Sequence, residues 1–120
     1  MKNMAITVHG PMDIRYEDRG VKAPGPGEVL IKVAAAGLCG TAAEVLSNEM
    51  FYYTSGMAKL PIVTGHEWCG VIQEVGGGVT SFAVGDKVTG ECTVNCGHCP
   101  QCTAGRANLC VNRTETGVMN

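Results

Sequence analysis

The sequence predicts one small domain that is mainly β with short helices, arranged as a small β-barrel. The chain has 120 residues, a length that fits a single domain with its own core. Short apolar segments are separated by predicted turns, and the 17 glycines and five prolines favour such turns. Apolar residues make up 45% of the chain and charged residues 17%, the balance of an ordered globular protein.

The first part of the chain is predicted to form three strands. Residues 4–10 and 12–18 are short β-type segments on either side of a turn at Gly10-Pro11. A loop of helix- and strand-breaking residues follows at 22–28. Residues 28–37 then alternate in polarity, as a strand does.

The segment after these strands changes to a helical period. Residues 41–50 contain good helix formers, and Thr41 with Glu44 three residues later matches a capping box. We therefore predict one short helix with Thr41 at its N-cap, followed by a loop over 52–61. The aromatic residues of 49–61 either line a substrate pocket or serve packing alone.

The glycine-rich segment 69–92 is predicted to return to β structure. It reads as a strand, a glycine-rich turn and a second strand, with Gly85-Asp86 turning the chain into the last strand. Together with the earlier segments, this gives the many short strands of the predicted barrel.

Charge and hydropathy exclude several classes of partner. The formal charge is −2 and no lysine or arginine cluster is present, so neither nucleic acid nor an anionic membrane is an expected partner. No apolar run is long enough to span a membrane, and residues 1–13 lack the apolar core of a signal peptide. We therefore expect a cytoplasmic protein, in which cysteines are metal ligands or packed thiols rather than disulfides.

Four of the seven cysteines lie in one short segment with the spacing C-x2-C-x2-C-x7-C. Sulfurs at such spacing can surround one tetrahedral ion at roughly 2.3 Å, and four thiolates leave no open position. The segment is therefore predicted to hold a structural zinc ion. The four residues of this cysteine cluster are Cys96, Cys99, Cys102 and Cys110.

Other interpretations of these cysteines and of nearby residues fit the sequence less well. Iron–sulfur proteins of the ferredoxin type place the fourth cysteine three residues on, before a proline, whereas Val111 follows the last cysteine here. His98 could replace one ligand, although a solvated loop histidine is the simpler interpretation. Cys69 and Cys92 are interpreted as packed thiols, because both alternate with apolar residues.

A second group of possible ligands lies upstream, in "GLCGTA" and "TGHEWCG". Cys39, His66 and Glu67 offer a thiolate, an imidazole and a carboxylate, the donors of a catalytic zinc with one exchangeable position. Taken singly, each residue is equally well explained by packing or solvation. The residues alone leave both interpretations open.

The order of these motifs resembles a known family. "GLCGT", "LPIVTGHEWCGVIQEVGGGVTSFAVGDKV" and "CGHCPQCTAGRANLC" are similar to the GroES-like N-terminal catalytic domain of zinc-dependent medium-chain alcohol dehydrogenases. The similarity runs from about Ile6 to Arg113, and "VTGECTVNCGHCPQC" is most similar to the threonine and polyol (sorbitol-type) branch. The resemblance implies a GroES-like small β-barrel over 1–120, with a structural-zinc lobe at about 92–113.

The resemblance also implies roles for individual residues. Cys39 and His66 would ligate a catalytic zinc, and Glu67 would lie near the metal or bind it transiently. Thr41 would relay the proton of the alcohol, and the cysteine cluster would hold the structural zinc. Zinc would act as a Lewis acid on a small alcohol or polyol, which then gives hydride to NAD(P).

The sequence departs from the family pattern at the site. Ala42 stands where the family commonly has an aspartate that supports the ligating histidine, and loss of such support typically costs about 10–100-fold in metal affinity or activity. Glu44 stands where a relay histidine is common.

The sequence also lacks the cofactor half of the family enzymes. No G-x-G-x-x-G follows a strand, so the Rossmann domain is absent and NAD(P) would bind only to the full-length enzyme. We therefore expect an inactive fragment of a longer enzyme that forms homo-oligomers. The alternative is a zinc-stabilised binding or structural module without a catalytic metal.

Overall fold

A computed structural model describes residues 2–119 of the chain. This part measures 41 × 39 × 21 Å along its principal axes and contains eight strands, three short α-helices and one 3-10 helix. In chain order these elements are β1 (Met4–Gly10), β2 (Asp13–Asp18), β3 (Val29–Gly37), α1 (Gly40–Ser47), α2 (Phe51–Thr54), β4 (Ile62–Val63), β5 (Glu67–Val75), β6 (Lys87–Thr89), β7 (Thr93–Val94), α3 (Pro100–Thr103), η1 (Ala107–Leu109) and β8 (Thr114–Glu115).

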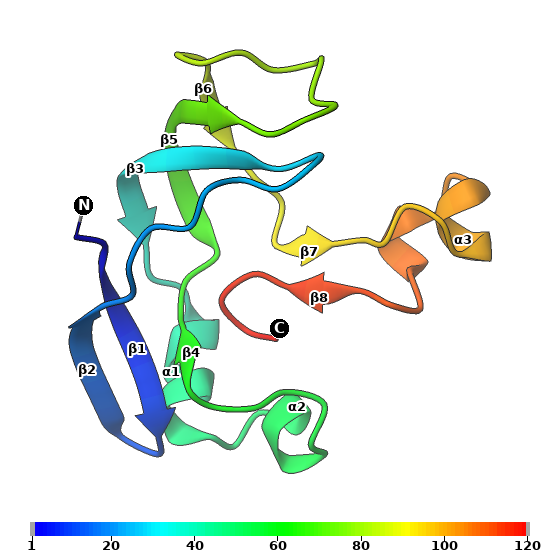
Figure 1. Ribbon diagram of the computed structural model, residues 1–120. Helices are drawn as coiled ribbons and strands as arrows, with labels where there is room; N and C mark the ends of the chain where they lie inside the picture. The colour runs from blue at the N-terminus through cyan, green and yellow to red at the C-terminus, as the bar shows by residue number, and fades with distance from the viewer. Residues whose placement is uncertain (1, 120) are drawn as a thin grey trace.

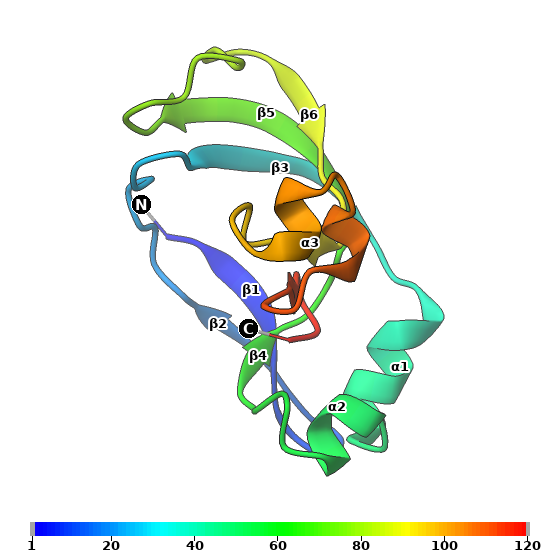
Figure 2. The same ribbon diagram turned by 90° about the vertical axis from the view of Figure 1, so that its right-hand side faces the viewer.

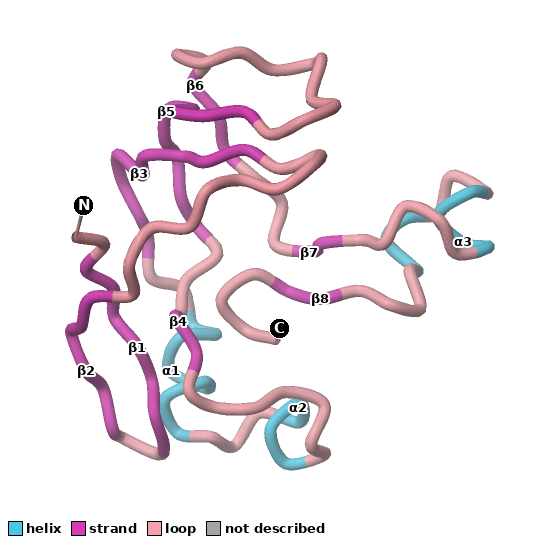
Figure 3. Tube along the Cα trace, viewed as in Figure 1, coloured by secondary structure: helices cyan, strands magenta, loops and turns pink. Residues whose placement is uncertain are grey.

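The strands form three sheets, which confirms the prediction of a mainly β domain with short helices. The order is β2-β1-β4 in one sheet, β3-β5-β6 in the second and β7-β8 in the third. Both ribbon views place the second sheet above the first, with α1 and α2 at the lower end (Figures 1 and 2). The β7-β8 hairpin runs outward to a separate lobe that carries α3, and much of that lobe is loop (Figure 3).

The pairing of β3 with β5 is the longest in the molecule and positions the site. The two strands are antiparallel, from Val29 opposite Val75 to Gly37 opposite Glu67. The register shifts twice along this ladder, which indicates β-bulges that bend the pair. Because Gly37 and Glu67 form the last pair, the residues that follow β3 and precede β5 are brought close together.

A small apolar core fixes α1 against the first sheet. Val8 of β1, Ile62 of β4 and Val45 of α1 are almost completely buried and pack together. Val8 and Ile62 are direct partners across the β1-β4 ladder, so their side chains share one face. Partly buried Met50, Tyr53 and Leu60 surround this cluster.

The helix differs from its prediction at both ends. It begins at Gly40 with Cys39 as the extended N-cap residue, and no side chain caps it, so the predicted capping box of Thr41 and Glu44 is wrong. Thr41 already lies within the first turn, because the carbonyl of Cys39 accepts the first helical bond from the N–H of Ala42. The helix ends at Ser47, where Asn48 adopts a left-handed conformation with φ of 59°.

Two further predictions differ from the structure. Part of the predicted loop 52–61 is helical, since α2 covers Phe51–Thr54. Residues 79–84 contain no strand and are mostly irregular. They lead into a turn at 83–86, in which the Asp86 carboxylate accepts a 2.8 Å bond from the Ala83 N–H. The last predicted strand is shortened to β6. Within 2–119, no helix has the length and apolar character needed to cross a membrane.

The core makes a first prediction. Val45→Ala should lower the free energy of unfolding by about 2 kcal/mol, because it removes two buried methyl groups and leaves a cavity. Val84→Ala, at a side chain that is 63% exposed, should cause almost no change. Urea unfolding of both variants measures the difference, and equal midpoints would contradict the assignment of the core.

Candidate functional site

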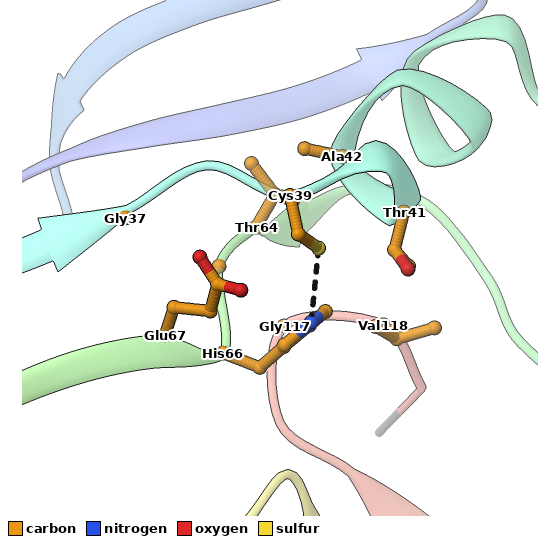
Figure 4. Close-up of a pocket in the computed structure, with 10 residues that line it drawn as sticks. Gly37, Cys39, Thr41, Ala42, Thr64, His66, Glu67, Gly117 and Val118 are labelled. Atoms are coloured by element: carbon orange, nitrogen blue, oxygen red, sulfur yellow. Dashed lines mark hydrogen bonds between the residues drawn. The ribbon is translucent and has the colours of Figure 1, made fainter. Parts of the chain in front are cut away.

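The structure brings Cys39 and His66 into direct contact. Cys39 lies two residues beyond the end of β3, and His66 immediately precedes β5. Their side chains are partly buried, and Cys39 Sγ lies 3.1 Å from His66 Nε2 (Figure 4). A soft sulfur and an imidazole nitrogen that face the same point are a donor set suited to zinc.

A small pocket surrounds this Cys39–His66 pair. Its volume is about 10 Å³, the space of roughly one water molecule or ion. The walls come from the ends of β3 and β5, the first turn of α1 and the C-terminal segment. The lining residues are Gly37, Cys39, Thr41, Ala42, Thr64, Gly65, His66, Glu67, Gly117 and Val118.

Glu67 lies at the edge of this pocket. It is the first residue of β5, and in the view of Figure 4 its carboxylate lies between Gly37 and Cys39. A Cβ atom at Gly37 would lie only 2.6 Å from Glu67 Oε2. The glycine at the end of β3 therefore makes room for the carboxylate beside Cys39.

The first turn of α1 contributes Thr41 and Ala42 to the pocket. The Thr41 side chain carries its hydroxyl near the Cys39–His66 pair (Figure 4). Ala42 offers no polar atom, and among residues 2–119 the contact with Cys39 is the one side-chain hydrogen bond of His66. Glu44 is exposed and does not line the pocket.

The cysteine cluster converges as its spacing predicts. One sulfur from each of the four residues lies within 4.8 Å of the other three. Cys99 Sγ is 3.6 Å from Cys102 Sγ and 3.9 Å from Cys110 Sγ. Zinc bonds of about 2.3 Å in a regular tetrahedron require sulfurs about 3.8 Å apart. These distances match the geometry of a closed zinc site.

The backbone around the cluster stabilises negative charge on two of the sulfurs. A bond from the His98 N–H is the main cause that lowers the pKa of Cys96 to about 6. The pKa of Cys99 is also lowered, first by the backbone of Cys102. Burial and the neighbouring thiols raise the pKa of Cys102 to about 12. A divalent metal bound by the four sulfurs would supply the positive charge that stabilises them as thiolates.

The remaining histidine and cysteine predictions have mixed outcomes. His98 is exposed and contacts the Cys96 carbonyl oxygen through Nδ1 at 2.7 Å, so it is not among the cluster's ligands. Cys92 is partly buried, and burial raises its pKa, as expected for a packed thiol. Cys69 is exposed on β5, so its prediction as a packed thiol is wrong.

Two residues that line the pocket, Gly117 and Val118, were not expected from the sequence. They follow β8 and are 51 and 52 residues beyond His66 in the chain, so no local pattern links them to it. The loop 49–61, considered as a possible pocket wall, is not part of the lining. Its tyrosines bond to the C-terminal segment instead, Tyr52 to Glu115 and Tyr53 to Val118.

Residues 25–119 match the alcohol dehydrogenase GroES-like domain family. The chain belongs to this family. An S-(hydroxymethyl)glutathione dehydrogenase from Photobacterium damsela subsp. piscicida is 42% identical over 99% of the chain and 32% of that protein. An L-threonine 3-dehydrogenase from Deinococcus deserti is 41% identical over 84% of the chain and 29% of that protein. The similarity to threonine dehydrogenases expected from the motifs is thereby confirmed.

Solved structures give the same assignment. A zinc-binding dehydrogenase from Sinorhizobium meliloti, bound to NADP, matches with a TM-score of 0.82 and 37% identity over 98% of this chain and 32% of that one. RspB from Escherichia coli, in complex with NADH, matches with a TM-score of 0.81 and 36% identity over 96% of this chain and 32% of that one. The chain spans about a third of the length of these relatives.

The cluster makes a second prediction. Cys102→Ser should weaken zinc binding at the cluster by roughly tenfold or more, because removing a direct ligand should cost more affinity than removing a group that only supports a ligand. It should also lower the melting temperature. Cys69→Ser, at an exposed thiol outside the cluster, is the matched control. Chelator competition and thermal melting measure both effects. If the two variants melted at the same temperature, the cluster would have no structural role.

Proposed function

We propose that residues 1–120 are the catalytic domain of a zinc-dependent, NAD(P)-linked alcohol or polyol dehydrogenase, with a structural-zinc lobe at about 92–113. The observation that carries this proposal is the 3.1 Å approach of Cys39 Sγ to His66 Nε2 in a pocket separate from the cysteine cluster. The cluster has no open position for a substrate. Chemistry is therefore assigned to the upstream pair.

Cys39 and His66 would hold the catalytic zinc, with Glu67 as the nearby carboxylate. Zinc held by these residues would supply a Lewis acid, which lowers the pKa of an alcohol hydroxyl. The partly buried pocket limits the access of water, which strengthens the electrostatic interactions within it.

Thr41 is proposed to accept and pass on the hydroxyl proton of the alcohol. Its position in the first turn of α1 is fixed by the helix, and its hydroxyl is not consumed by helix capping. A hydroxyl is both donor and acceptor, so it can receive one proton while it releases another. Its place in the lining of the pocket supports this role.

The remaining parts of the proposal concern partners. The substrate would be a small alcohol or polyol. NAD(P) would bind outside these 120 residues, and the surfaces that join the subunits of a homo-oligomer would also lie outside them. The chain by itself would then be inactive. A cytoplasmic location fits the seven free cysteines, four of which gather as one potential ligand set.

A zinc-stabilised module without a catalytic metal is the second candidate. It is favoured by Ala42, which leaves His66 without a supporting carboxylate in the first turn of α1. The two candidates differ in the number of metal ions that the chain binds. A dehydrogenase domain requires two sites, whereas a module requires the cysteine cluster alone.

Counting zinc in the native chain tests the proposal. The chain should bind about two zinc ions, and His66→Ala should bind about one, because the catalytic site loses a direct ligand. His98→Ala removes an exposed histidine near the cluster and should retain both ions. Native mass spectrometry measures the stoichiometry. A single ion in the unaltered chain would favour the module.

Ala42→Asp tests the supporting role that the alanine cannot fulfil. A carboxylate at this position should bond to the imidazole and raise the zinc affinity of the Cys39–His66 pair by roughly 10–100-fold. Ala43→Asp, one position along on the exposed side of α1, is the charge-matched control. Chelator competition compares the variants. Equal affinities would show that residue 42 does not act on the pair.

A further inference from the structure

The C-terminal segment 115–119 forms a tight turn against the Cys39–His66 site. The N–H of Glu115 donates to the Met119 carbonyl, and the Met119 N–H donates back to the Glu115 carbonyl, both at 2.8 Å. Val118 is 1% exposed and Met119 6% exposed, so the turn is packed inside the molecule. Gly117, at its apex, passes beside His66 (Figure 4).

Gly117 makes a close backbone contact with Gly65. A Cβ atom on Gly117 would lie 2.5 Å from the Gly65 nitrogen and 2.6 Å from its carbonyl carbon, and nearer still to its carbonyl oxygen. All three are backbone atoms that cannot rotate away, so no side chain fits at residue 117. Both glycines also have positive φ, +70° at Gly117 and +117° at Gly65.

Independent bonds hold the segment in this place. The Tyr53 hydroxyl donates to the Val118 carbonyl at 2.7 Å, and the Tyr52 hydroxyl donates to Glu115 Oε1 at 3.0 Å. The Thr116 N–H donates to the Cys92 carbonyl at 2.9 Å. The segment is thus anchored on both sides of Gly117, and the contact with Gly65 follows from these anchors.

We propose that Gly117 is a positioning residue for His66. Gly65 immediately precedes His66, so a constraint on the Gly65 backbone fixes the origin of the imidazole side chain. The ring then faces Cys39, although no second side chain among residues 2–119 hydrogen-bonds to it. The proposal rests on the proposed function, in which this pair binds the catalytic metal.

The main test compares Gly117→Ala with Gly78→Ala. Gly78 has a similar φ of +80° but open space around its missing Cβ, so both variants carry the same backbone strain and only Gly117→Ala creates the clash. Gly117→Ala should weaken zinc binding at the Cys39–His66 pair by roughly tenfold or more. Removing a group that orients a metal ligand typically lowers metal affinity by about this factor. The cysteine cluster should stay loaded in both.

A metal-free readout separates this inference from the proposed function. The ring nitrogen resonances of His66, assigned with His66→Ala, report the imidazole's environment without any metal. They should shift in Gly117→Ala and stay in place in Gly78→Ala. If they moved equally in both, the positioning role would be overturned. If they behaved as expected but the unaltered chain bound one zinc ion, only the proposed function would fail.

A milder variant covers the case in which Gly117→Ala does not fold. Tyr53→Phe removes the hydroxyl that anchors Val118 and keeps the packing of the ring. It should shift the same His66 resonances in the same direction, whereas Tyr16→Phe, at a side chain that is 71% exposed, should not. Unchanged His66 resonances in folded Tyr53→Phe would overturn the role of the segment.

Discussion

The register between β3 and β5 is the constraint on which the site depends. The ladder ends with Gly37 opposite Glu67, and the two candidate ligands lie just beyond that pair, Cys39 on one side and His66 on the other. A slip of one residue would exchange the two faces of the strand and carry the ligands apart. The 3.1 Å distance between Cys39 Sγ and His66 Nε2 is therefore a consequence of strand pairing. Gly37 contributes because it has no side chain and leaves space for Glu67 beside it.

The outer lobe is built on a different principle. In the segment between β7 and β8, the buried residues are two of the cysteines themselves, Cys99 and Cys110. Apolar Leu109 and Val111 are exposed, so the lobe has almost no hydrophobic core. Its four sulfurs and the backbone bonds around them must supply the order that apolar burial gives elsewhere. The core of Val8, Val45 and Ile62 serves the other end of the molecule and cannot replace them.

The sequence predicts local chemistry well and long-range contacts poorly. The cysteine cluster could be predicted because its spacing brings the sulfurs together whatever the rest of the chain does. The Cys39–His66 pair spans 27 residues, and its donor chemistry left packing and metal binding equally open until the family resemblance favoured a metal site. The capping-box motif failed because the helix begins one residue earlier, at Gly40 with Cys39 as its N-cap residue, which places Thr41 inside the first turn. The Gly65–Gly117 contact leaves no sequence pattern, since it joins two backbones rather than two side chains.

Backbone packing takes over a task at this site that hydrogen bonds often perform. Ligating histidines are commonly oriented by a second polar partner, and Ala42 cannot provide one. In its place, His66 follows a glycine that is confined by Gly117, and Gly117 belongs to a turn anchored by two tyrosines of α2. Such a contact fixes where the side chain begins. The site therefore has an imidazole that faces Cys39 and is positioned by the backbone of its neighbours rather than by a supporting carboxylate.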